Sequence, residues 1–269
     1  MPPVRIALMI EGQEGVTWQQ WVALAQAAEA AGIEALFRSD HYSTVTGRGG
    51  GSLDAWTTLA GLAALTTRLR LGTLVSPVTF RHPSVLARAL VTVDHISGGR
   101  AELGMGAGWM EREHEAFGFP FPPYEERAAL LAEQIEIVHR QWTEDRFSFQ
   151  GRFYELTDCE ALPKPVQRPH PPLLVGGKGR RRTLEVAARW ADEYNAFHVA
   201  PEVFRGLREQ LDQALAAVGR EPGSVRLSLM TPLDGWSTER SREYEAVGVE
   251  RVFLQHFDHE DLGAVERLG

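Results

Sequence analysis

Short apolar runs recur along the chain, and most are followed by a stretch whose apolar residues repeat at helical spacing. Strands that alternate with helices pair in parallel through right-handed crossovers. Eight such units predict a closed (β/α)8 TIM barrel, since a doubly wound open sheet, the alternative, usually has fewer strands. The runs place these strands near residues 4–10, 35–39, 69–75, 101–105, 172–176, 194–198, 225–230 and 251–256.

The helical stretches carry recognisable start and stop signals. Thr17 and Gln20 form a T-x-x-Q capping box, and Gly32 ends the helix that it starts. Further helices are expected over about 54–67, after Pro83, over about 124–142 and over about 180–191.

The fourth and fifth strands are separated by much more chain than one helix needs. We therefore predict an insertion over about 143–171, with a hairpin around Gly151 and a proline-rich connector. No shift in composition marks an independent unit, so we interpret residues 1–269 as a single TIM-barrel domain.

Composition narrows the class of protein. A net charge of −8 argues against a nucleic-acid or anionic-membrane partner, because both favour a basic face. Cys159 is the only cysteine and cannot form an intramolecular disulfide, which suits the reducing cytoplasm where we expect the protein to work. No stretch approaches the roughly 18 apolar residues of a membrane span.

The segment after the fifth strand is the clearest candidate binding site. Gly176, Gly177 and Gly179 let the backbone approach a ligand closely, and a helix begins directly after them. Lys178 and Arg180 add positive charge to the partial charge of that helix end. A phosphate fits such a turn, although the same residues could form an ordinary strand-to-helix turn with solvated arginines.

The candidate catalytic residues follow the second strand. His41 can titrate near neutral pH, and Asp40 could orient either the imidazole or the chain around it. A histidine held by local structure alone is the other interpretation. Both residues follow the carboxyl end of a strand, where TIM-barrel enzymes carry their active sites.

Several segments together resemble the luciferase-like monooxygenase superfamily. They include the run that ends in Ser-Asp-His41, Leu-Gly-Thr-Leu-Val-Ser-Pro77, Gly-Met-Gly-Ala-Gly-Trp109 and Pro-Pro-Leu-Leu-Val-Gly-Gly177. The resemblance covers roughly residues 4–200 in order and is most similar to the branch that uses the deazaflavin coenzyme F420. It implies a barrel with the coenzyme ring at its mouth and the hydride transfer of an oxidoreductase.

The same resemblance implies roles for individual residues. Asp40 and His41 would lie beside the deazaflavin, with His41 as the group that transfers a proton. Leu74–Val75 matches a non-proline cis peptide that bulges against the back face of the ring. The remaining cofactor-binding positions would hold the coenzyme tail and its phosphate: Ala107, Gly108, Arg112, Gly176, Gly177, Lys178, Gly179 and Arg180.

One position departs from the pattern of that branch. Some of its sugar-phosphate dehydrogenases carry a catalytic glutamate where this chain has Trp109. Glu111 and Glu113 are near in sequence, but we expect them to turn elsewhere on the following helix. An activity that needs this acid is therefore doubtful here.

The partners and cofactors follow from the resemblance, with alternatives left open. We expect F420, a small organic substrate that the sequence does not identify, and a homodimer. The alternatives are an FMN-dependent monooxygenase and a barrel that binds a flavin or phosphate ligand without catalysis. His256 and His259 flank an aspartate, but no second ligand cluster supports a metal site, and we predict none.

Overall fold

The strands of the barrel form where the sequence predicts them. The computed structural model describes residues 4–47 and 50–268 of the predicted domain. Its strands are β1 (Arg5–Ile10), β2 (Ala35–Arg38), β3 (Arg70–Thr73), β4 (Ser76–Pro77), β5 (Ala101–Gly106), β6 (Phe147–Gln150), β7 (Glu155–Cys159), β8 (Leu173–Gly176), β9 (Glu193–Phe197), β10 (Arg226–Pro232) and β11 (Arg251–His256). The predicted third strand corresponds to β3, and the two-residue β4 follows directly after the predicted range.

The main sheet is parallel and closes on itself. Its strands follow the order β3, β2, β1, β11, β10, β9, β8, β5 and β4, and the pairing of β3 with β5 completes the ring. β1 pairs with β11 over six residues, from Arg5 opposite Arg251 to Ile10 opposite His256. The predicted (β/α)8 barrel is confirmed.

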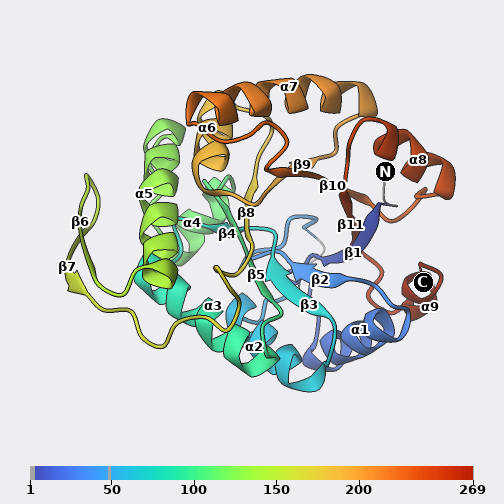
Figure 1. Ribbon diagram of the computed structural model, residues 1–269. Coiled ribbons are helices and arrows are strands. Elements are labelled where there is room, and N and C mark those ends of the chain that lie inside the picture. Colours follow the sequence, from blue (N-terminus) through green and yellow to red (C-terminus); the bar gives the residue numbers. More distant parts are fainter. Residues whose placement is uncertain (1–3, 48–49, 269) are drawn as a thin grey trace.

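Helices accompany the strands, and most of them surround the barrel on the outside (Figure 1). They are α1 (Trp18–Ala30), α2 (Ala55–Leu65), α3 (Pro83–Ser97), α4 (Glu111–Phe117), α5 (Tyr124–Thr143), α6 (Arg181–Trp190), α7 (Pro201–Ala217), α8 (Thr238–Ala246) and α9 (Leu262–Glu266). Both halves of the predicted capping box are present at α1, where Thr17 accepts from the backbone of Gln20 and Gln20 reaches back to Thr17. Trp21, Leu24 and Ala28 bury the inner face of this helix against the sheet.

The predicted insertion contains an antiparallel hairpin. β6 and β7 pair on either side of Gly151, whose backbone N–H donates to the carbonyl of Tyr154. The hairpin extends away from the barrel beside α5 (Figure 1). Because it lies outside the ring of strands, the insertion leaves the closure of the barrel unchanged.

Candidate active site

His41 lies directly beyond the end of β2, and a glutamate from α4 holds it. Its Nδ1 is 2.8 Å from Oε2 of Glu113, and the exposed fractions of the two side chains are 15% and 0%. The other carboxylate oxygen of Glu113 accepts from the backbone N–H groups of Tyr42 and Ser43. The expectation that Glu113 turns elsewhere is wrong, because the first turn of α4 packs against the loop that follows β2.

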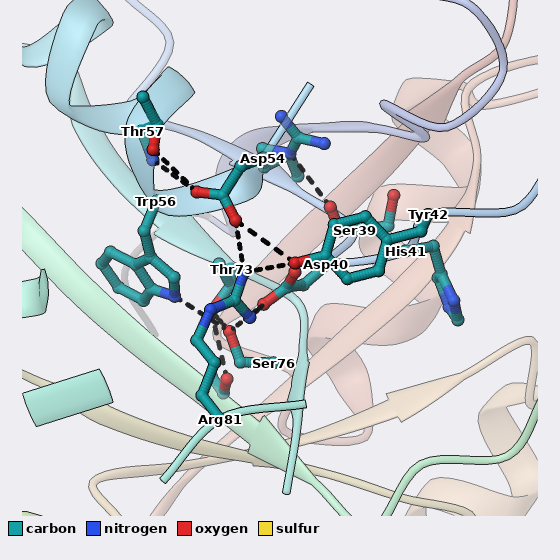
Figure 2. A network of polar contacts seen from close by, with 12 residues as sticks. Ser39, Asp40, His41, Tyr42, Asp54, Trp56, Thr57, Thr73, Ser76 and Arg81 are labelled. Atoms are coloured by element: carbon teal, nitrogen blue, oxygen red, sulfur yellow. Dashed lines mark hydrogen bonds and ion pairs between the residues drawn. The ribbon is translucent and has the colours of Figure 1, made fainter. Parts of the chain in front are cut away.

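The carboxylate of Asp40 is directed away from His41. Asp40 is 1% exposed, and its Oδ2 accepts from the Ser76 hydroxyl at 2.7 Å and from the guanidinium of Arg81. The other arm of Arg81 reaches Asp54 at 2.7 Å. Figure 2 shows these contacts together, with the imidazole of His41 pointing out of the network. Asp40 therefore fixes the chain around His41 and does not touch its ring.

A bulge lies between β3 and β4, at the position that the resemblance indicated. The Leu74–Val75 peptide bond is cis, as expected. The side chain of Val75 lies against three glycines: Gly104, Gly106 and Gly176. If Gly106 or Gly176 carried a side chain, its Cβ would lie only 2.6 Å or 2.9 Å from a methyl group of Val75, which is too close for two carbon atoms. These glycines of β5 and β8 therefore make room for the bulge itself.

The glycine-rich turn after β8 leads into the uncapped end of α6. The first N–H groups of this ten-residue helix have no intrahelical partner, and no side chain of the described residues caps them. The N–H of Gly177 donates to the carbonyl of Asn195, and that of Gly179 to the Tyr194 hydroxyl. Within the described chain, no hydrogen bond engages the backbone N–H of Lys178. Among the described residues, the free backbone donors of this turn are therefore the amides of Lys178 and Arg180 and those of the first turn of α6.

Two residues of α5 complete the surroundings of this turn. The hydroxyl of Tyr124 is buried and has no hydrogen-bond partner among the residues that the structure describes, and the Arg180 guanidinium lies 4.2 Å from the centre of its ring. Arg127, which is 7% exposed, donates from Nε to the carbonyl of Ala107 at 3.1 Å. An unpartnered phenol beside free backbone amides and arginines suits a phosphate, so the residues present fit the tail of a flavin-type coenzyme.

Arg127 is not among the residues predicted from the sequence, and the role of Arg112 at the coenzyme tail stays a prediction. An arginine on the apolar face of a predicted helix was the available signal for Arg127, because a buried guanidinium needs partners. Arg112 donates to the carbonyl of Thr44 at 2.8 Å, so it lies beside the loop after β2. Ala107 and Gly108 follow β5, and Gly108 has a φ of +79°.

A second histidine lies at the end of β9. His198 has a φ of +53°, which is uncommon for a residue with a side chain. Its Nε2 is 3.2 Å from the side-chain amide oxygen of Gln255. The amide nitrogen of Gln255 donates to the buried carboxylate of Glu11. A polar chain from β9, β11 and the end of β1 therefore shares this end of the barrel with His41.

The described residues contain neither a metal-binding cluster nor a helix that could span a membrane. Over residues 4–47 and 50–268, no group of three His, Cys, Asp or Glu side chains is placed to hold a metal ion. His256 contacts the carbonyl of Asp261 at 3.2 Å. In the same ranges, the helices are too short or too polar to cross a bilayer.

A closed barrel with a titratable histidine, a backbone bulge and a helix terminus at one end has the architecture of barrel enzymes that act on bound small molecules. The chain belongs to the luciferase-like monooxygenase family, whose model matches residues 3–254.

Individual relatives divide between two coenzymes. The chain is 30% identical over 238 residues to an FMNH2-dependent dimethylsulfone monooxygenase of Pseudomonas putida. This alignment covers 88% of this chain and 62% of that protein. It is 30% identical over 247 residues to an F420-dependent glucose-6-phosphate dehydrogenase of Intrasporangium calvum, covering 84% of this chain and 74% of that protein. The chain thus spans less than two thirds of the length of the first of these relatives.

A solved structure shows the same fold. An F420-dependent secondary alcohol dehydrogenase, in complex with an F420–acetone adduct, superposes with a TM-score of 0.84 over 98% of this chain and 96% of that chain. The sequence identity is 14%. The likeness therefore concerns the fold.

Proposed function

We propose that this protein is an oxidoreductase that transfers hydride between coenzyme F420 and a small organic substrate. The observation that carries the proposal is His41, an imidazole paired with a buried carboxylate at the end of the barrel where substrates bind. The F420-dependent relative, which aligns over 74% of its own length, supports the choice of coenzyme.

The residues of the chain divide the work between binding and proton transfer. When bound, F420 supplies the hydride chemistry, which no side chain provides. Lys178, Arg180 and the first turn of α6 would hold its phosphate. For an alcohol substrate, His41 accepts the hydroxyl proton, and in the reverse direction it donates one. Val75 would form the wall behind the ring.

The proposal is tested by anaerobic titration of the protein with F420 and, separately, with FMN. We expect micromolar binding of F420 and much weaker binding of FMN. Turnover is then measured as the change in coenzyme absorbance with a panel of alcohols and carbonyl compounds. Binding of FMN alone would contradict the proposal, and so would F420 binding with no redox change for any substrate.

An FMN-dependent monooxygenase is the second candidate. Its support is the dimethylsulfone monooxygenase of Pseudomonas putida, whose alignment covers 88% of this chain. This candidate predicts that reduced FMN binds tightly and that substrate is oxygenated only when oxygen is present. The same titration therefore separates the two candidates.

The proposed phosphate cradle, which consists of Lys178, Arg180 and the first turn of α6, can be tested by substitution. Replacing both Lys178 and Arg180 by glutamine should weaken coenzyme binding about tenfold, because a hydrogen bond to a charged group contributes about 1.5–3 kcal/mol and these side chains are exposed. Arg189→Gln, at the opposite end of α6, is the matched control and should bind as tightly as the wild type. Affinity is measured by isothermal titration calorimetry. Equal losses in the double variant and the control would argue against the cradle.

A further inference from the structure

Every oxygen of the Glu113 carboxylate is engaged by one short segment of the chain. Oε2 contacts Nδ1 of His41 at 2.8 Å, while Oε1 accepts from the backbone N–H groups of Tyr42 and Ser43. The side chain is fully buried. Although burial favours the neutral acid, the hydrogen bond and charge of His41, together with the two N–H groups, lower the pKa of Glu113. The residue is therefore a carboxylate at neutral pH and can only accept.

This arrangement decides which nitrogen of His41 carries the hydrogen. Because the partner of Nδ1 only accepts, Nδ1 must donate, and neutral His41 then has a bare Nε2. In the described chain, no hydrogen bond engages Nε2. The ring of Trp109 stands edge-on to the imidazole, with 5.7 Å between the ring centres. The nitrogen available for substrate is therefore Nε2.

We propose that Glu113 is the positioning residue of this active site: it holds His41 with Nδ1 protonated and presents Nε2 to the substrate. The inference rests on the proposed function for its catalytic consequence, but the tautomer itself does not depend on the coenzyme. Neutral His41 can then accept a substrate proton at Nε2, and the imidazolium can return it. No acid at position 109 is needed for this step.

The charges around His41 support the same assignment. Burial disfavours the imidazolium, but the hydrogen bond and charge of Glu113 outweigh it and raise the pKa of His41, with smaller contributions from Glu11 and Asp40. Asp40 is itself paired with Arg81. Of these carboxylates, Glu113 alone contacts the ring in the described structure, so its removal should lower the pKa of His41 most.

Glu113→Gln tests the proposal sharply. The N–H groups of Tyr42 and Ser43 require an oxygen, so the amide nitrogen of the new side chain must face His41 and donate to Nδ1. The neutral imidazole should then change to the tautomer with hydrogen on Nε2, and its pKa should fall. We expect kcat to fall by about 10²-fold, the lower end of the usual range for general acid–base catalysis, with KM changed by less than about threefold.

The main readout needs no coenzyme. Nitrogen-15 NMR of the imidazole, assigned by the loss of its signals in His41→Gln, reports both tautomer and pKa. Glu115→Gln, an exposed residue of the same helix, is the control and should match the wild type. If Glu113→Gln does not fold, the NMR spectrum of the wild type still shows which nitrogen of His41 carries the hydrogen and so tests the proposal. A wild-type His41 with hydrogen on Nε2, or a variant with unchanged tautomer and pKa, would overturn the proposal, whereas failure of F420 to bind would affect only the proposed function.

Discussion

Replacing Arg251 by methionine is expected to lower the free energy of unfolding by about 3–5 kcal/mol, the usual cost of removing one partner from a buried ion pair. Arg251, on β11, is 1% exposed inside the barrel. Its Nη2 lies 2.8 Å from a carboxylate oxygen of Glu102 and 2.8 Å from one of Glu193. Methionine fills much of the same volume but leaves two buried carboxylates near each other.

A partly exposed arginine beside Arg251, Glu102 and Glu193 provides the control. Arg226 contacts Glu193 at 2.8 Å, but it is 29% exposed, and Glu193 keeps Arg251 when Arg226 is lost. Arg226→Met should therefore cost only about 1 kcal/mol or less. Urea unfolding monitored by circular dichroism measures both variants. Equal costs at the two positions would show that burial of the central arginine does not matter.

The same contacts predict how stability depends on pH. Burial alone would raise the pKa of Glu102, but Arg251 and Arg70 outweigh it and lower that pKa from 4.5 to about 2. A depressed carboxyl pKa stabilises the fold fully above the pKa of the unfolded chain. This contribution should therefore be complete above about pH 4.5 and disappear as the pH falls towards about 2. In Arg251→Met, the free energy of unfolding should fall less between about pH 4.5 and about pH 2 than it does in the wild type.

Local patterns were sufficient to predict the fold. The capping box of Thr17 and Gln20 and the apolar strands depend on neighbours within a few residues. The network around Arg251 does not, because its partners Glu102 and Glu193 meet it only once the barrel closes. A charged residue within each of three apolar strands was the available signal, since such residues are rarely buried unpaired.

The candidate site was predicted less completely, for the same reason. His41 and the glycine-rich turn lie at strand ends that the sequence marks. In the sequence, Glu113 cannot be told from any acidic residue in the first turn of a helix. It reaches His41 only because α4 packs against the loop after β2. The contact of Val75 with the glycines of β5 likewise forms only when the strands are assembled, so neighbouring residues in the sequence do not reveal it.

Replacing His41 by alanine is expected to reduce kcat by about 10²–10⁴-fold, the usual contribution of a positioned general acid or base. Coenzyme affinity should change by no more than a few-fold, because in the proposed function Lys178, Arg180 and the first turn of α6 would hold the tail independently of this ring. His95→Ala is the matched control: its imidazole is exposed and contacts the carbonyl of Lys164, in the insertion connector. Steady-state kinetics and titration of each variant separate catalysis from binding, and unchanged turnover with coenzyme bound would exclude the role.

The pH profile shows which form of His41 is used in each direction. The pKa of His41 is raised above its ordinary 6.5, because Glu113 outweighs the effect of burial. In the proposed function, substrate oxidation would need the neutral ring, so its rate should fall as the pH drops below that raised pKa. Reduction would need the imidazolium, so its rate should fall as the pH rises above that pKa. A histidine that only packed against Trp109 would leave both profiles without this opposed dependence, and His41→Ala should abolish it in both directions.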